Sequence, residues 1–520
     1  MRHPWDRRLG VWWIAEDHPD QVAILASPSG TRTFAELAGG AHQLVHALRS
    51  IGLQPGAVVA AMLANGVEMI ECSLACQEAG WYFLPLNTFL TAPEVARIVA
   101  HSGSSVLVTQ AQYAHIVAAP ELDAVRGDTV VLSIDDIPGT DSLAELRSRF
   151  PTAEPPDRLT GSLFTYTSGT TGQPKGIRRP IPPGDPTVTA NESALFGRAF
   201  DFRPFDGSHL VSTAMYHGGS HSFYMGALNV GQGLVIMPKF DAEETLRLIE
   251  RFRVTTAYMV PTQFHRLLRL PSDVRARYNL SSLHSVVHAA APCPRDVKQQ
   301  MLDWWGPVIW ETYGGMESPA TIAKPWRWLE KPGTVGRAIR GVTLAVLDDE
   351  GQALANGQPG LIYIGTDRPP FAYHGDEEGT SKAFHGGRFT LGDVGYLDDD
   401  GYLFIIDRAK DMIITGGVNV YPQEVEAVLL ADPRVLDVAV IGVPDEDWGE
   451  QIKAVVQLTP GVEPSPTVAA DLIRHCRERL AAYKCPRSVD FREDLPRTDA
   501  GKLYKRQIRD EYWQAMGRAV

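Results

Sequence analysis

Cysteine is scarce in this chain, which has five among 520 residues. A small, odd number in so long a chain does not indicate the disulfide framework of a small secreted domain. Cys72 and Cys76 lie four residues apart in a segment expected to be helical, so they share one face. No second Cys/His pair accompanies them, so we expect them to pack in the core rather than to bind a metal.

Long apolar runs are missing as well. Val11–Ala15 is too short for the core of a signal peptide. The least polar window, Ser222–Pro238, is rich in glycine and too short to span a bilayer comfortably. The sequence therefore predicts a cytoplasmic protein without a membrane span, and it leaves the oligomeric state open, a homodimer included.

Basic residues are outnumbered by acidic ones, 49 to 62, so the net charge is −13. An acidic surface repels a polyanion, which argues against nucleic acid as the main partner but allows a local basic pocket for a small anion. Apolar residues make up 44% and charged residues 21%, which is ordinary for a globular protein.

Apolar segments alternate with amphipathic ones as far as about residue 320. We expect strands at Val58–Leu63, Trp81–Leu86, Val106–Thr109, Gly233–Met237, Thr255–Val260, Ser285–Ala289 and Val308–Glu311. Between them we expect helices at Val67–Ala79, after Thr91, after Asp241 and at Gln263–Leu270. Buried strands alternating with helices predict an α/β fold, with a large N-terminal domain of parallel sheets covered by helices.

The pattern changes near Pro332. The turn signals Asp348–Gly351 and Asp398–Gly401 are typical of hairpins and indicate a β-rich subdomain at about 332–406. After Arg408 a small α+β unit begins, with a helix expected at Pro422–Leu430. We therefore predict an N-terminal domain at 1–407 and a mobile C-terminal domain at 408–520.

The strongest local motif is a run of hydroxyl and glycine residues that follows a strand. It consists of Thr167, Ser168, Gly169, Thr170, Thr171, Gly172, Gln173, Pro174, Lys175 and Gly176. Glycine lets backbone N–H groups turn towards an anion, hydroxyls add donors, and lysine adds charge. The composition favours a phosphate-binding loop, although a flexible loop without a ligand is the alternative. Because Pro174 precedes Lys175 and Gly176 follows it, the run is not a Walker loop.

This run resembles the signature of the adenylate-forming superfamily, which contains acyl-CoA synthetases, peptide-synthetase adenylation domains and firefly luciferase. The resemblance is closest to the acyl-CoA synthetases, and it covers essentially the whole chain. Further matching motifs follow in order: Tyr313-Gly314-Gly315-Met316-Glu317, Gly392-Asp393, Asp407–Asp411, Gly416–Glu424 and Pro496–Lys502. It implies a large N-terminal and a small mobile C-terminal domain, with ATP and a carboxylic acid bound in their cleft.

The resemblance implies roles for the charged residues of these motifs. Lys502 would bridge the carboxylate and the α-phosphate, and Glu317 would hold the Mg²⁺ that neutralises the phosphates. Asp393 would accept hydrogen bonds from the ribose hydroxyls, and Arg408 would contact the nucleotide. The alternatives are a solvated lysine in a basic tail for Lys502, a helix-cap carboxylate for Glu317, and turn or salt-bridge residues for Asp393 and Arg408.

Small and aromatic residues complete the expected binding regions. Adenine would lie along Ala289, Ala290, Ala291 and Pro292, unless these residues are only a buried strand end. The acyl group would be bordered by Tyr216, His217, Gly218, Gly219 and His221 together with Gly314 and Gly315. For His217 a structural hydrogen bond is an equal alternative, and His221 is the weaker candidate. The pair Gly218 and Gly219 leaves room for a bulky acid.

The C-terminal motifs imply movement. By resemblance, the loop Gly416-Gly417-Val418 would line the entrance for the pantetheine arm of CoA. Lys502 and this loop serve different half-reactions and cannot both face the cleft, so the C-terminal domain must rotate. Lys410 occupies the hinge position of the family; a surface lysine is the alternative.

One residue departs from the family pattern. Met316 stands where the family usually has threonine, whose hydroxyl helps to hold the α-phosphate. Methionine offers a weak acceptor and no donor. The ATP-dependent half-reaction is therefore the step that this departure affects.

We predict an acid–thiol ligase that uses ATP and Mg²⁺ to convert a hydrophobic, long-chain or polycyclic carboxylic acid into its acyl-CoA. The alternatives are an enzyme that acts mainly on a preformed acyl-adenylate, one that loads a carrier protein, and a non-catalytic binder of carboxylate or nucleotide. A degenerate binder should have lost Lys502 or the phosphate loop, and both are present. No carrier-protein pattern follows the last expected helix, so we expect an external acceptor, of which CoA is the simplest.

Overall fold

The structure is a computed structural model that describes residues 5, 7–167, 175–367, 371–415, 418–445, 447–497 and 503–515. The chain forms two compact units. The first comprises Met1–Ala289, Met301–Trp310 and Arg368–Lys382, and the second comprises Ala290–Gln300, Glu311–Asp367 and Ala383–Val520. No helix in the described ranges is both long and apolar enough to cross a membrane.

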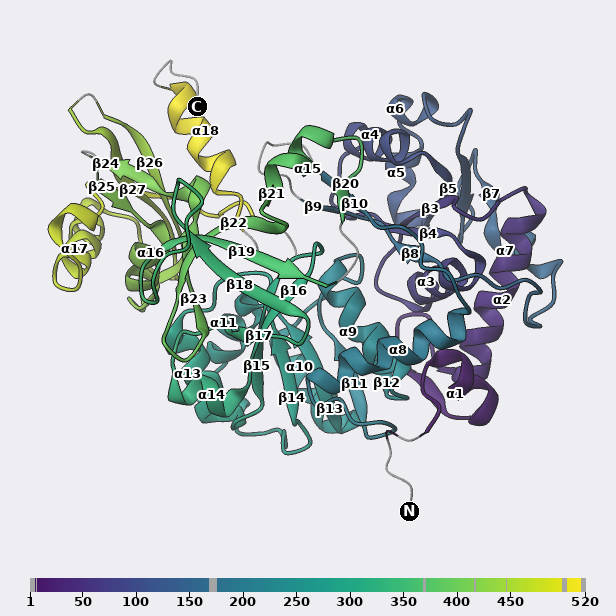
Figure 1. Cartoon of the computed structure of the whole chain (residues 1–520). Helices are drawn as coiled ribbons and strands as arrows, with labels where there is room; N and C mark the ends of the chain where they lie inside the picture. Colours follow the sequence, from purple (N-terminus) through teal and green to yellow (C-terminus); the bar gives the residue numbers. More distant parts are fainter. Residues whose placement is uncertain are drawn as a thin grey trace. The chain divides into compact units, whose positions relative to one another are not determined.

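Figure 1 shows the helices of the chain, most of them with labels, as in Figure 1. They are α1 (Val11–Asp17), α2 (Phe34–Ser50), α3 (Val67–Ala79), α4 (Ala92–Ser102), α5 (Ala114–Val117), α6 (Pro120–Asp123), α7 (Leu143–Ser148), α8 (Pro186–Ala199), α9 (Gly218–Asn229), α10 (Ala242–Phe252), α11 (Pro261–Leu268), α12 (Ser272–Arg275), α13 (Arg295–Trp305), α14 (Pro325–Glu330), α15 (Glu377–Ala383), α16 (Pro422–Leu430), α17 (Pro466–Arg477) and α18 (Lys505–Ala515). The expected helix at Val67–Ala79 is confirmed, and Gly80 ends it in the left-handed conformation that glycine adopts easily.

The first unit contains two sheets of parallel strands. One runs in the order β7 (Asp141–Ser142), β6 (Val130–Ser133), β5 (Ser104–Thr109), β3 (Val58–Met62), β4 (Tyr82–Pro85) and β8 (Ser162–Leu163). The strands of the other are β14 (Ser285–His288), β13 (Val254–Met259), β11 (Ser208–Val211), β12 (Gly233–Ile236) and β1 (Val22–Ala26), and the short β2 (Arg32–Thr33) adds to β1 antiparallel. The predicted parallel α/β architecture is thereby confirmed.

A small antiparallel sheet in the first unit carries the phosphate motif. It consists of β9 (Thr165–Thr167), β10 (Lys175–Arg178) and β20 (Ala372–Tyr373). The strands on either side of the motif therefore pair with each other, and β10 also pairs with a strand from much later in the chain.

Antiparallel strands dominate the second unit. They are β16 (Pro319–Ala323), β17 (Gly336–Ala338), β18 (Val342–Leu347), β19 (Gly360–Thr366), β21 (Phe384–His385), β22 (Arg388–Leu397) and β23 (Tyr402–Arg408), with β15 (Ile309–Gly314) paired to β16. The predicted turn Asp398–Gly401 joins β22 to β23, which confirms a hairpin there. The turn at Asp348–Gly351 is also present but belongs to a longer connection, because β18 ends at Leu347 and β19 begins at Gly360.

The last part of the second unit is a sheet covered on both faces. Its strands are β24 (Ile413–Thr415), β25 (Val418–Val420), β26 (Val435–Asp445), β27 (Gly449–Leu458) and β28 (Ser488–Phe491). Alternate residues of β26 belong to different cores, because side chains alternate across a strand. Val438 and Val440 lie in one core with residues of α16 and α17, whereas Ala439 and Ile441 pack with Ile508 of α18.

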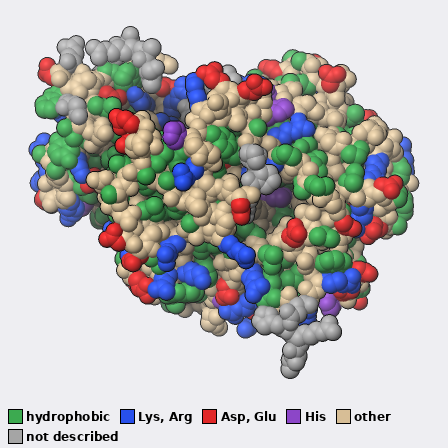
Figure 2. Space-filling view, viewed as in Figure 1, with side chains coloured by type: hydrophobic (Ala, Val, Ile, Leu, Met, Phe, Trp, Pro, Cys, Tyr) green, Lys and Arg blue, Asp and Glu red, His purple; other side chains and the backbone are tan. Residues whose placement is uncertain are grey.

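Cys72 and Cys76 are buried in α3, which confirms their expected role in packing. Side chains of both charge signs occur across the face viewed in Figure 2. The predicted boundary between residues 407 and 408 stays a prediction.

Candidate active site

Three of the predicted nucleotide residues converge in the second unit. β22 and β23 place Asp393 directly opposite Arg408, and the Nε of Arg408 lies 3.1 Å from Oδ1 of Asp393. The hydroxyl of Tyr313, on β15, donates a hydrogen bond of 2.8 Å to Oδ2 of Asp393. Burial, together with the Asp393 carboxylate, raises the pKa of Tyr313, so its phenol remains a donor at neutral pH. The salt bridge considered as an alternative for Asp393 and Arg408 is thus present, and it fixes the carboxylate.

The turn after Tyr313 requires its two glycines. A Cβ on Gly314 would lie 2.5 Å from the carbonyl oxygen of Ser318, and the φ of Gly314 is +152°. A Cβ on Gly315 would lie 2.2 Å from Oε2 of Glu317, so the Glu317 carboxylate folds back over Gly315. Glu317 is buried and Met316 is half-buried in this turn. A carboxylate fixed beside an exposed glycine suits one protein ligand for Mg²⁺, with substrate phosphates supplying others.

The loop after β14 is strained. Ala290 has a φ of +73°, in the left-handed region that residues with a Cβ seldom occupy. Ala290 and Pro292 are exposed, and Ala289 and Ala291 are half-buried. The segment is therefore not simply a buried strand end, and backbone strain of this kind is a feature of functional sites.

The phosphate motif is partly described. Thr167 and Lys175 lie opposite each other where β9 and β10 pair. Ser168, Gly169, Thr170, Thr171 and Gly172 lie outside the described residues. The ammonium of Lys175 lies 3.1 Å from Oδ2 of Asp376 and 4.5 Å from the centre of the Tyr373 ring. Sequence reasoning did not single out Asp376 or Tyr373, because nothing local links them to Lys175.

The predicted acyl-pocket residues lie at the start of α9. The ring of His217 packs 4.3 Å from that of Tyr216, and its buried Nε2 has no hydrogen-bond partner in the described part of the chain. Burial lowers the pKa of His217 to about 4, so its imidazole is neutral at pH 7. A Cβ on Gly219 would lie 2.7 Å from the hydroxyl of Tyr258. The space beside Gly219 is thus taken up by Tyr258, whose ring stacks on Phe223.

His221 is buried one turn further along α9. Its Nε2 lies 2.7 Å from the hydroxyl of Ser73, which also accepts a hydrogen bond from Gln77 of α3. Burial lowers the pKa of His221 to about 4. A neutral histidine bonded to a neighbouring helix has a structural role, in keeping with its weaker standing as a site candidate.

Lys410 follows β23 in a 3₁₀ turn, Ala409–Asp411, and burial lowers the pKa of its ammonium. Val418 is exposed at the start of β25. Gly416, Gly417 and Lys502 lie outside the described residues, as does most of the motif around Lys502.

Lys505, three residues after Lys502, does not belong to a solvated basic tail. Its ammonium is buried and lies 2.8 Å from Oε1 of Glu426. Glu426 in turn accepts a hydrogen bond from the backbone of Val440. The residues that follow the Lys502 motif are thereby fixed to the core of the sheet.

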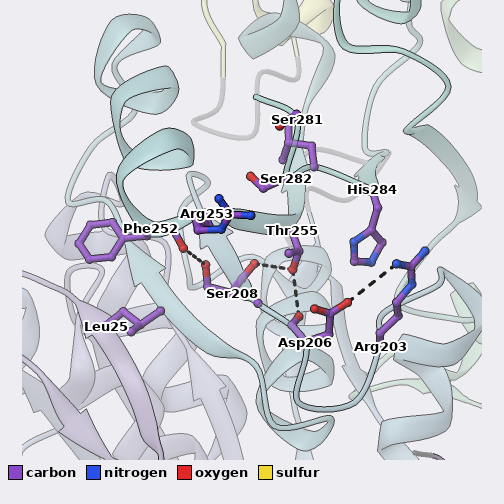
Figure 3. A pocket seen from close by; sticks show the side chains of 12 residues that line it. Leu25, Arg203, Asp206, Ser208, Phe252, Arg253, Thr255, Ser281, Ser282 and His284 are labelled. Atoms are coloured by element: carbon purple, nitrogen blue, oxygen red, sulfur yellow. Dashed lines mark hydrogen bonds and ion pairs between the residues drawn. The ribbon is translucent and has the colours of Figure 1, made fainter. Parts of the chain in front are cut away.

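A cavity of about 580 Å³ lies at the other ends of the parallel strands (Figure 3). Its polar groups bind one another: Ser208 donates to the carbonyl of Phe252, Thr255 to that of Asp206, and Arg203 pairs with Asp201. Ligands of open α/β sheets bind at the carboxyl ends of the strands, where His217 and Ala289 follow β11 and β14. We therefore do not assign the chemistry to this cavity.

Within the described ranges, no group of three or more His, Cys, Asp or Glu side chains could hold a metal ion alone. A metal would thus depend on substrate oxygen atoms, as the predicted Mg²⁺ at Glu317 does.

Comparisons with known proteins agree with these motifs. Residues 11–368 match the family model described as AMP-binding enzyme, and residues 424–502 match that of the AMP-binding enzyme C-terminal domain. The long-chain-fatty-acid–CoA ligase FadD13 of Mycobacterium tuberculosis is 34% identical over 95% of both chains. The feruloyl-CoA synthase of an Amycolatopsis species is 33% identical over 97% of this chain and 99% of its own.

A solved structure shows the same fold. The anthranilate CoA ligase AuaEII in complex with anthranoyl-AMP superposes with a TM-score of 0.83, at 25% identity, over 99% of both chains. These matches confirm the adenylate-forming fold and the enzyme class, an acid–CoA ligase, that the motifs predict.

Proposed function

The chain belongs to the AMP-binding enzyme family, and we propose that it joins a hydrophobic carboxylic acid to CoA in two steps. In the first step a carboxylate oxygen attacks the α-phosphorus of ATP, so that an acyl-adenylate forms and pyrophosphate leaves. In the second step the thiol of CoA attacks the acyl carbon, and AMP leaves.

The arrangement around Asp393 carries the nucleotide assignment. Each oxygen of this carboxylate has one partner, Arg408 or Tyr313, and keeps a lone pair for a further donor. Because these partners already fix the carboxylate, accepting hydrogen bonds from ribose hydroxyls costs little additional ordering. A flat base would lie against the small side chains of the Ala289–Pro292 loop.

The first step brings two anions together, so positive charge must offset their repulsion. We assign Lys175 to the phosphates and Lys502 to the contact between carboxylate and α-phosphate. Glu317 would hold Mg²⁺, which neutralises phosphate charge when it is bound. The buried pair of Lys505 and Glu426 anchors the start of α18, and this limits how far the Lys502 motif moves relative to its own sheet.

We place the hinge at Lys410, with domains at 1–407 and 408–520. Asp407 precedes this point, and its Oδ2 accepts a hydrogen bond of 2.8 Å from the backbone of Gln423, which follows it. A rotation about Lys410 would break this contact. It would bring the Gly416-Gly417-Val418 loop to the pantetheine arm in place of Lys502.

A hydrophobic acid suits the aromatic surroundings at the start of α9. Tyr216, Phe223 and Tyr258 are buried there, and the neutral His217 brings no charge that would favour a second anionic group. FadD13, feruloyl-CoA synthase and AuaEII are named for fatty, hydroxycinnamic and aromatic acids. We therefore propose a long-chain or polycyclic acid.

The test is acid-dependent exchange of labelled pyrophosphate into ATP, with a panel of fatty, aryl and polycyclic acids. At least one hydrophobic acid should support exchange, and adding CoA should then yield its thioester. Tyr313→Phe should raise the KM for ATP, whereas Tyr396→Phe, whose ring stacks on Phe404 on a neighbouring strand, should not. Exchange with no acid, or equal KM values in the two variants, would contradict the proposal.

Met316 favours a second candidate function. With no hydroxyl at this position, the enzyme could serve mainly to convert a preformed acyl-adenylate into the thioester. Product formation from synthetic acyl-adenylate and CoA, but not from acid, ATP and CoA, would support this function instead.

A further inference from the structure

The lysine of the phosphate motif is held by a later segment of the chain. Lys175 begins β10, and the ammonium lies 3.1 Å from Oδ2 of Asp376. The backbone fixes this approach, because Tyr373 of β20 pairs with Ile177 of β10 and the amide of His374 donates to the carbonyl of Gly176. The contact therefore follows from strand pairing rather than from a chance meeting of two long side chains.

Asp376 uses its two oxygens for different purposes. Oδ1 accepts a hydrogen bond of 2.7 Å from the amide of Gly379 and so caps the first turn of α15. Oδ2 faces Lys175. A Cβ on Gly379 would lie 2.1 Å from Oδ2 of Asp376 and 2.6 Å from the Lys175 nitrogen, so glycine is needed for the carboxylate and the ammonium to meet.

The ion pair is suited to exchange. The side chains of Lys175 and Asp376 are 19% and 39% exposed, so water screens their attraction and replacing one partner costs little. The hydrogen bond from Gly379 and the contact with Lys175 lower the pKa of Asp376, which is ionised at neutral pH. A phosphate group offers the same ammonium more negative charge than a carboxylate does.

We propose that Asp376 is a placeholder for phosphate: it holds Lys175 before ATP binds and gives it up to the phosphates of ATP. The inference rests on the proposed function, in which Lys175 contacts ATP, and it adds Asp376 as the residue that sets the affinity. The carboxylate positions the ammonium at the exit of the motif and competes with the incoming nucleotide. ATP must displace it to bind.

The direct test is Asp376→Asn. Asparagine keeps an oxygen for the amide of Gly379 and removes the charge, so the cap of α15 is retained. We expect the Kd of ATP, measured by titration calorimetry, to fall about three- to tenfold, in line with a partly exposed ion pair. A merely structural role would lower the thermal midpoint and leave the Kd unchanged.

Asp241 offers a matched control. It caps α10 through the same spacing, with Oδ1 accepting a hydrogen bond of 2.8 Å from the amide of Glu244. Within the described ranges, its carboxylate forms no ion pair with a lysine. Asp241→Asn should leave the Kd of ATP unchanged.

A double-mutant cycle tests whether the effect acts through Lys175. In a Lys175→Met background, Asp376→Asn should no longer tighten ATP binding. An unchanged or raised Kd in Asp376→Asn alone, or the same tightening without Lys175, would overturn the placeholder role while leaving the proposed function intact. A wild-type protein that binds no ATP would contradict both.

Discussion

The ammonium of Lys298 lies 2.6 Å from the carboxylate of Glu311, and both groups are buried. The pair joins α13 to β15 two residues before Tyr313, and the Lys298 nitrogen also lies 4.9 Å from the centre of the Trp328 ring. Burial lowers the pKa of Lys298 and raises that of Glu311, so each charge depends on the other. A buried ionic link therefore supports the strand that presents Tyr313.

Removing one partner of this pair should strongly destabilise the fold. Lys298→Met leaves the Glu311 carboxylate buried without its cation, and we expect a loss of about 3–5 kcal/mol in the free energy of unfolding. The double variant Lys298→Met, Glu311→Gln should recover part of this loss, because no buried charge remains. Urea unfolding measures both, and equal stability of the wild type and the single variant would contradict the prediction.

Lys331 provides a control for the removal of a lysine as such. Its ammonium pairs with Asp398 and Asp400 in a more exposed position than Lys298. Lys331→Met should cause a clearly smaller loss of stability.

Buried histidines should make the first unit sensitive to acid. Burial lowers the pKa of His209 to about 3, and those of His217 and His221 to about 4, from 6.5. As the pH falls below 6.5, the unfolded chain binds protons that the native histidines do not. Stability is therefore unaffected above this pH and falls below it, by about 1.4 kcal/mol per pH unit for each such histidine.

His209 is the histidine best suited to a test, because its ring bonds to Thr256 away from the candidate site. His209→Gln should match the wild-type dependence of the urea midpoint on pH above about pH 7 and show a shallower decline towards about pH 5. His18→Gln, at an exposed position, should decline as steeply as the wild type. Parallel profiles for His209→Gln and the wild type would refute the assignment.

Local patterns predicted most of the elements. Thr91 and Asp241 lie at the N-caps of α4 and α10, each with a glutamate three residues on, and both helices form as expected. Pairings between distant segments could not be predicted in this way. The strand β20 is two residues long and has no periodicity, so its contact with β10 appears only in the structure.

The candidate site shows the same division. Motif resemblance selected Tyr313, Asp393 and Arg408, but their contacts depend on the register of β22 against β23. Asp376 carries no motif signal, since its role depends on Lys175, which lies near it only after folding. Burial of Lys505 could not be read from a sequence in which basic residues cluster near the C-terminus.

The two half-reactions should respond differently to two substitutions. Lys502→Ala should cripple adenylation and largely spare thiol attack on a supplied acyl-adenylate, because Lys502 would face the substrates only in the first step. Lys410→Pro should do the reverse, since proline fixes φ and blocks the backbone change that rotation needs. Each half-reaction is measured separately, by pyrophosphate exchange and by thioester formation from acyl-adenylate.

Equal loss in both half-reactions on Lys502→Ala would show that this lysine is not specific to adenylation. Normal thioester formation by the proline variant would place the hinge elsewhere. As a matched substitution in an exposed turn, Asp349→Pro lies in the connection between β18 and β19 and should affect neither step.

Met316 should slow adenylation by a bounded amount. A hydrogen bond to a charged group contributes about 1.5–3 kcal/mol, so its absence from the transition state would cost about 10- to 150-fold in rate. Thiol attack on the adenylate involves no departure of pyrophosphate and should escape this loss. Ligation from acid, ATP and CoA should therefore be slower than ligation from synthetic acyl-adenylate and CoA.

Met316→Thr should narrow the gap between these two rates by restoring a hydroxyl in the turn that Gly314 and Gly315 form. The two rates are measured side by side in the wild type and the variant. Met316→Ala controls for the loss of the thioether, because it shortens the side chain without adding a donor, and its ratio should remain close to that of the wild type. If the wild-type rates are equal, or if Thr and Ala change the ratio alike, the hydroxyl has no part in the first step and Met316 is a neutral replacement.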